Sequence, residues 1–135
     1  MTLTTAERDT LISAALAARD KAYAPYSKFH VGAALLLDDG SIVAGCNVEN
    51  ISYGLTICAE RVAIGTMVAQ GKSSPRAVAV ATEGGGSPCG ACRQVLAEFA
   101  PALPVYLIDA TTRDVVETNM TELLPRQFAT DLLGK

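Results

Sequence analysis

Hydrophobic residues recur along the N-terminal segment at the spacing of one face of an α-helix. Thr4 and Glu7 form a T-x-x-E capping box, a pattern typical of a helix start. The apolar positions behind it predict a helix that continues to about Ala22, and they are Leu11, Ile12, Ala15 and Leu16. Pro25 marks the end of this segment.

The rest of the chain alternates between short apolar runs and helical patterns. Residues 29–37 and 41–46 are predicted to form two strands joined by a turn at Asp38-Asp39-Gly40. Further strands are predicted over 77–82, 105–108 and 115–117, helices over 58–70 and 90–99, and a short turn over 121–124. A hairpin followed by alternating helices and strands predicts an α/β fold: a three-layer α/β/α arrangement around a central mixed five-stranded sheet.

Length and charge restrict the class of protein. The chain has 135 residues, half of them hydrophobic, which fits one domain over residues 1–135 with a core of mainly aliphatic side chains. The net charge is −3, and Lys and Arg do not cluster. A nucleic-acid binder normally presents a basic face, so we expect a small-molecule substrate and no nucleic acid.

The chain shows no sign of a membrane segment or a signal peptide. Residues 1–10 are polar and charged, and the longest apolar run, 31–37, is far too short to cross a bilayer. These features predict a cytoplasmic protein with no membrane partner. Thiols stay reduced in that compartment, so four cysteines suggest metal binding or catalysis before disulfides.

Two cysteine segments carry the candidate chemistry, Cys58-Ala59-Glu60 and Pro88-Cys89-Gly90-Ala91-Cys92. Both lie where a loop enters a predicted helix, a position that favours thiolates. A C-x-x-C pair alone suits a redox dithiol or half of a structural zinc site equally well. With Cys58 as a third ligand, a zinc ion keeps a fourth position open for water, and Glu60 could reach that water without binding the metal.

Cys46 leaves another interpretation open. As a fourth ligand it would close the site, and the protein would be a structural zinc or interaction module. Because Cys46 ends a predicted strand, a role as a small core residue is favoured. His30 is predicted to be an ordinary packed or exposed histidine, and Arg93 receives no role.

Several motifs in one order closely resemble the small homotetrameric zinc-dependent cytidine deaminases. They are YAPYSKFHVGAA at 23–34, GCNVENISYG at 45–54, CAER at 58–61 and PCGACRQ at 88–94. The x-E … P-C-x-x-C pattern is also typical of zinc deaminases in general. The resemblance runs from the first helix to the segment 123–128, and only residues 109–119 match no motif.

The resemblance implies hydrolytic deamination of cytidine and 2′-deoxycytidine to uridine and 2′-deoxyuridine, with release of ammonia, in pyrimidine salvage. One Zn²⁺ per subunit would be held by Cys58, Cys89 and Cys92, and Arg61 would hydrogen-bond the thiolates. Glu60 would move protons between water, ring N3 and the leaving amine. Another aminopyrimidine, such as blasticidin S, and a nucleic acid stay open as alternative substrates.

The resemblance also assigns substrate contacts, at Phe29, Asn47, Glu49, Tyr53, Ala59 and Phe128. Asn47 and Glu49 would bind the ribose 3′-hydroxyl, and Phe29 would pack against the pyrimidine. The backbone of Ala59 would read the base edge with Glu60. Tyr53 and Phe128 would reach a neighbouring subunit's site, which implies a homotetramer with composite sites. Without the resemblance, Phe29 would be interpreted as core and the loop polar residues as turn chemistry.

Overall fold

The computed structural model describes residues 2–129, which form one mixed sheet with helices on both faces. The helices are α1 (Thr5–Arg19), α2 (Ala59–Ala69), α3 (Gly90–Phe99) and α4 (Met120–Leu123), with a 3₁₀ turn η1 at Tyr53–Leu55. The strands are β1 (Gly32–Leu37), β2 (Ile42–Cys46), β3 (Pro75–Thr82), β4 (Pro104–Asp109) and β5 (Val115–Asn119). Their order is β2-β1-β3-β4-β5, with only the β3–β4 pair parallel. The predicted mixed five-stranded sheet is confirmed.

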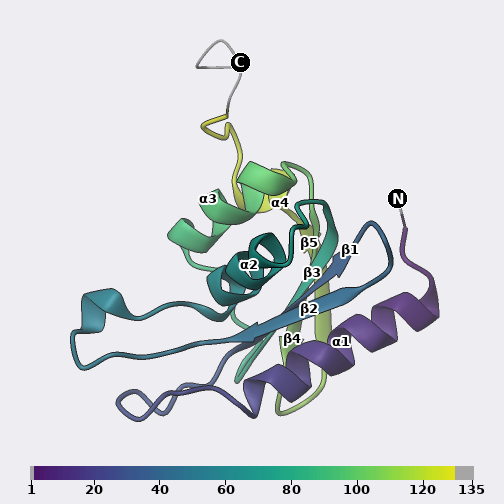
Figure 1. Ribbon diagram of the computed structural model, residues 1–135. Coiled ribbons are helices and arrows are strands. Elements are labelled where there is room, and N and C mark those ends of the chain that lie inside the picture. Colours follow the sequence, from purple (N-terminus) through teal and green to yellow (C-terminus); the bar gives the residue numbers. More distant parts are fainter. Residues whose placement is uncertain (1, 130–135) are drawn as a thin grey trace.

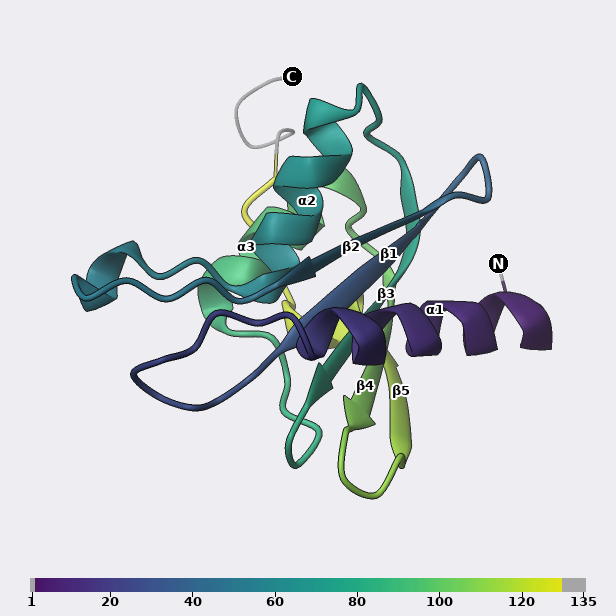
Figure 2. The ribbon, with the colours of Figure 1, turned by 60° about the horizontal axis from the view of Figure 1, so that its bottom comes forward.

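The helices sort into two layers, as the side-chain alternation of the strands requires. Helix α1 covers one face of the sheet, and α2 and α3 cover the other (Figures 1 and 2). Ala34 and Leu36 of β1 pack with the α1 side, whereas Ala33 and Leu35 pack with the α2 and α3 side. Every residue of β1 is buried, which explains why its sequence is continuously apolar. Among the described residues, no helix is long and apolar enough to span a membrane.

The predicted capping box is confirmed. Glu7 N–H donates to Thr4 Oγ1 at 3.1 Å, and Thr4 N–H donates to Glu7 Oε1 at 2.9 Å. Helix α1 ends at Arg19, earlier than predicted from the apolar spacing. The predicted turn at 121–124 is instead the short helix α4, which Asn119 caps by accepting from Glu122 N–H.

The first predicted strand begins three residues late, because the side chain of Asn47 bonds two of the backbone groups in residues 29–31. Asn47 Oδ1 accepts from Val31 N–H at 3.0 Å, and Asn47 Nδ2 donates to Phe29 O at 2.8 Å. Lys28 has φ 61°, which turns the chain just before this segment. Phe29 O and Val31 N–H are therefore bonded by a side chain and not by a neighbouring strand, and β1 starts at Gly32.

Helix α2 lies unusually close to β2 at Gly45. A Cβ atom added there would be 2.5 Å from Ala63 N and 2.7 Å from Ala59 O, so only glycine fits. Because Gly45 pairs with Ala33, this contact places the start of α2, with Cys58 and Glu60, against the sheet beside the start of β1.

Candidate metal centre and active site

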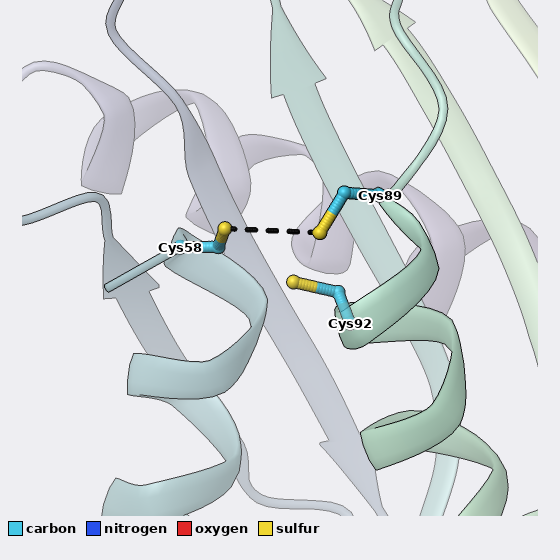
Figure 3. Close-up of side chains that lie close together, drawn as sticks. All are labelled: Cys58, Cys89 and Cys92. Atoms are coloured by element: carbon cyan, nitrogen blue, oxygen red, sulfur yellow. Dashed lines mark hydrogen bonds between the residues drawn. The ribbon is translucent and has the colours of Figure 1, made fainter. Parts of the chain in front are cut away.

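The starts of α2 and α3 face each other and bring three thiols together. Cys58 is the N-cap of α2, Cys89 is the N-cap of α3, and Cys92 lies in the first turn of α3. Their sulfurs point toward one another (Figure 3) and lie within 4.8 Å of each other. Cys58 Sγ and Cys89 Sγ are 3.9 Å apart. Tetrahedral zinc bound to sulfur at about 2.3 Å separates its ligands by about 3.8 Å, so the cluster suits this metal.

The electrostatics of the cluster also favour a bound cation. Burial, and then the charge of Glu60, raise the pKa of the Cys92 thiol. Burial opposes ionisation of Cys89 as well, but hydrogen bonds led by the Cys92 backbone N–H outweigh it and lower the pKa of Cys89. Three thiolates this close together repel one another, so a cation bound among them would stabilise the ionised cluster. Cys58 makes no side-chain capping hydrogen bond to α2, so its sulfur remains available as a ligand.

Arg61 places a positive charge beside the sulfurs. Its Nη2 donates to Cys58 Sγ at 3.3 Å. Hydrogen bonds to Cys58 and then to Cys92 raise the pKa of the guanidinium, so it stays charged. Its Nε is buried and has no hydrogen-bond partner within residues 2–129. The guanidinium of this partly buried side chain thus contacts the cysteine cluster directly.

Glu60 lies at the inner wall of a pocket of about 270 Å³ that opens onto the cysteines. Phe29, Asn47, Cys58 and Cys89 also line this pocket. Glu60 is only 4% exposed, and burial raises the pKa of its carboxyl group. A carboxyl group with a raised pKa beside a metal-binding cluster is suited to accept and return protons near neutral pH.

The predicted ribose ligands hold the loop in front of β1. Glu49 Oε1 accepts from Tyr26 N–H at 3.0 Å and from Ser27 N–H at 3.1 Å, and Oε2 accepts from the Ser27 hydroxyl. Glu49 and Tyr53 line a second hollow of about 350 Å³, which shares Thr56 with the pocket at Glu60. Ser27 could not be singled out from the sequence, because its contact to Glu49 spans 22 residues.

The two predicted intersubunit residues lie away from the pocket at Glu60. Tyr53 is 73% exposed and sits on η1, in an arm that projects from the body of the subunit (Figure 1). Phe128 is 63% exposed, and its carbonyl accepts from Gln94 Nε2 at 3.2 Å. Neither side chain lines the pocket of its own chain.

Cys46 lies outside the group of three cysteines in the described part of the chain. Its thiol donates to Lys21 O at 3.5 Å at the end of β2. His30 is partly buried, and its carbonyl accepts from Arg19 Nε at 3.1 Å.

The sheet, the paired helix starts and the open three-cysteine cluster together define a zinc-binding hydrolase of the deaminase fold. Residues 5–108 match the model of the cytidine and deoxycytidylate deaminase zinc-binding region, and the chain belongs to this family. The family's zinc-binding region and the three cysteines fit one Zn²⁺ per subunit.

Relatives and solved structures agree with this assignment. The chain is 51% identical to a cytidine deaminase of Sporosarcina psychrophila over 129 residues, covering 93% of this chain and 94% of the relative. A crystal structure of cytidine deaminase from Burkholderia pseudomallei superposes with a TM-score of 0.86 at 50% identity, covering 93% of this chain and 100% of that one. A blasticidin-S deaminase of Bacillus cereus is more distant, at 31% identity over 117 residues, covering 76% of this chain and 79% of the relative.

Proposed function

We propose that this chain is a zinc-dependent hydrolase that deaminates cytidine and 2′-deoxycytidine to uridine and 2′-deoxyuridine, releasing ammonia. The observation that carries the proposal is the three-cysteine cluster with buried Glu60 beside it in one pocket. Relatives named cytidine deaminase at 46–51% identity support the same substrate. Residues 1–135 would act as one domain, in the cytoplasm and in pyrimidine salvage.

The chemistry divides between the metal and Glu60. A zinc ion held by Cys58, Cys89 and Cys92 would supply a Lewis acid that makes water a nucleophile near neutral pH. Glu60 would accept a proton from the attacking water and deliver it to N3 of the ring, which makes C4 electrophilic. The water oxygen bonds C4. Glu60 would then take the second proton of that water from the new C4 hydroxyl group and pass it to the amino nitrogen, so that the C4–N bond breaks, ammonia leaves and the C4 carbonyl of uridine forms.

Asn47 and Glu49 each keep capacity for a ribose hydroxyl. An amide nitrogen carries two donors, and Asn47 Nδ2 uses one of them on Phe29 O. A carboxylate offers about four acceptor positions, and Glu49 uses three of them on Tyr26 and Ser27. One remaining donor and one remaining acceptor match the 3′-hydroxyl. Both ribo- and 2′-deoxyribonucleosides carry that group, which is why we propose both as substrates.

Phe29 and Ala59 would complete the base subsite. Phe29 is 45% exposed at the pocket mouth, so its ring is available for a pyrimidine to pack against. Ala59 is fully buried between the ligand Cys58 and Glu60, where its backbone would read the base edge.

An ultraviolet assay tests the proposed reaction directly. Cytidine and 2′-deoxycytidine should be converted to uridine and 2′-deoxyuridine. Activity should be lost with a zinc chelator and return when zinc is added. Blasticidin S and a cytosine-containing single-stranded oligonucleotide serve as the comparison substrates. Turnover of either one without turnover of cytidine would contradict the proposal.

Arg61→Gln is expected to lower kcat by about 10–100-fold, the usual cost of losing a group that supports a metal ligand. Three thiolates outweigh a divalent cation by one negative charge, and Arg61 at 3.3 Å from Cys58 Sγ offsets it. Without the guanidinium, the excess negative charge opposes proton loss from the attacking water, so the pH–rate profile should move to higher pH.

Arg61→Lys is the matched variant, because it keeps the charge but loses the planar donor group. The Lys variant should retain more of the wild-type pH profile than the Gln variant. Superimposable pH–rate profiles for wild type and Arg61→Gln would show that Arg61 compensates no charge at the site.

We also propose that the protein is a homotetramer with composite sites. Large apolar side chains are exposed on the arm and the C-terminal segment, namely Ile51, Tyr53, Leu55 and Phe128. The three on the arm lie close together in sequence, and exposed apolar groups of this kind mark interaction surfaces. In addition, the pocket of about 270 Å³ lies just below the usual range for ligand sites, about 300–1,000 Å³. A neighbouring subunit that supplies Phe128 would enclose it further.

Hybrid tetramers test the composite site. Phe128→Ala and Glu60→Gln subunits are each expected to have low activity alone. Unfolding and refolding them together should restore part of the activity, because some sites combine an intact Glu60 with an intact Phe128 from a neighbour. A fully active monomer in light scattering, or no recovery in verified mixed tetramers, would contradict the proposal.

A further inference from the structure

The loop that leads into Cys89 has little intrinsic rigidity. It contains Gly84, Gly85 and Gly86 in succession, and the first two have φ of 86° and 70°. Glycine gives the unfolded chain more freedom than any other residue, so a glycine run costs the most to order. The Cys89 thiol is itself exposed, so core packing does not fix it. Pro88 is buried, but the exposed Ser87 and Cys89 on either side of it depend on hydrogen bonds for their positions.

Side chains anchor the glycine part of the loop. Thr82 Oγ1 accepts from Gly86 N–H at 2.6 Å, and Asp109 Oδ1 accepts from Gly84 N–H at 3.3 Å. These contacts end at Gly86. The last two residues before Cys89 are held by a different group.

That group is the guanidinium of Arg93. Its Nε donates to Pro88 O at 2.8 Å, and its Nη2 donates to Ser87 Oγ at 2.8 Å. Arg93 follows the ligand Cys92 directly, yet no contact between its guanidinium and a sulfur is found among the described residues. The Arg93 side chain extends back along the first turn of α3 and hydrogen-bonds the two residues that precede Cys89.

The third contact of Arg93 connects this segment to the C-terminal part of the chain. Its Nη1 donates to Leu123 O at 2.7 Å, at the end of α4. Carbonyls at a helix C-terminus have no partner within the helix, so a cation there is favourable. The neighbouring Gln94 donates to Phe128 O at 3.2 Å. Consecutive residues of α3 thus hold the chain from Leu123 to Phe128 beside the metal-site loop.

We infer that Arg93 is a positioning residue for the metal centre: it fixes Ser87 and Pro88, and hence Cys89, by tying them to the end of α4. The inference rests on the three cysteines as zinc ligands and not on the proposed reaction. Arg61 neutralises the sulfurs by direct contact, whereas Arg93 acts only through the backbone and Ser87.

Zinc release to a chromophoric chelator tests the inference on the zinc-loaded full-length protein. Arg93→Met should release zinc about 10–100-fold faster than wild type, the range found for groups that orient metal ligands. Arg93→Lys, which retains part of the donor set, should fall between the two. Ser87→Ala removes one of the three contacts from an exposed residue and should speed release about two- to fivefold, the effect of one net hydrogen bond.

Arg19→Met is the matched control. It also removes a partly buried guanidinium that donates to a backbone carbonyl, that of His30, but on α1 away from the cysteines. It should release zinc at the wild-type rate even if its Tm falls. Equal acceleration in Arg19→Met and Arg93→Met would mean that general destabilisation causes the release, and would overturn the inference. If Arg93→Met does not fold, wild-type release rates in both Arg93→Lys and Ser87→Ala would overturn it equally.

Discussion

Glu60→Gln is expected to lower kcat for cytidine by at least about 10³-fold while one zinc ion per subunit is retained. General acid–base catalysis contributes about 10²–10⁴-fold, and here one carboxyl group would act twice, at the attacking water and at the leaving amine. An amide has nearly the same shape but cannot accept and return a proton. Turnover should therefore fall for both cytidine and 2′-deoxycytidine.

The fold should tolerate this change. Glu60 is 4% exposed, and burial raises the pKa of its carboxyl group, which means that the surroundings disfavour its ionised form. A neutral amide of similar volume removes that cost, so Tm should not decrease. Glu98→Gln, at an exposed position on α3, is the matched control and should leave kcat and zinc content at wild-type values.

Zinc content and single-turnover rates of Glu60→Gln and Glu98→Gln test whether Glu60 transfers protons. Near-wild-type deamination by Glu60→Gln at full zinc occupancy would remove Glu60 from the proton-transfer role. Loss of zinc together with activity would instead make Glu60 part of the metal-binding group.

Much of the architecture could be predicted because local patterns agree with the tertiary environment. The continuous apolar run of β3 reflects burial between helix layers, and the capping box at Thr4 fixes the start of α1. The prediction failed at residues 29–31, where Asn47 side-chain atoms take the backbone partners that a strand would use. Local sequence propensity could not predict these side-chain hydrogen bonds, since Asn47 is 16 residues from Val31 in the sequence.

The candidate site divides in the same way. The three cysteines and Glu60 lie at characteristic spacings at helix starts, and this local pattern can be recognised in the sequence alone. A role for Arg93 could not be assigned from the sequence, because it depends on a hydrogen bond to Leu123, 30 residues away. Ser27 is similar, since only the fold brings it to Glu49. A local sequence pattern thus identifies the candidate metal ligands. The residues that position them, such as Arg93, can be identified only from the structure.

Cys89→Ala is expected to abolish tight zinc binding and, with it, nearly all deamination. Cys89 provides one of only three sulfurs that lie within 4.8 Å of each other among residues 2–129, so its loss leaves two protein ligands. Two thiolates are too few for either a structural or a catalytic zinc site. Because Cys89 is exposed and outside the hydrophobic core, the alanine variant should still fold when metal is absent.

Cys46→Ala is the paired variant that separates an open catalytic site from a closed four-thiolate site. Cys46 Sγ donates to Lys21 O at 3.5 Å and does not belong to the three-cysteine group, so this variant should keep one zinc per subunit and most of its activity. Zinc content by plasma emission spectrometry and turnover of cytidine are measured on both proteins after dialysis against the same dilute chelator. Equal zinc loss from Cys46→Ala and Cys89→Ala would place Cys46 on the metal. Cys46 would then occupy the fourth coordination position, which a hydrolase needs for water, and the proposed hydrolytic function would be contradicted.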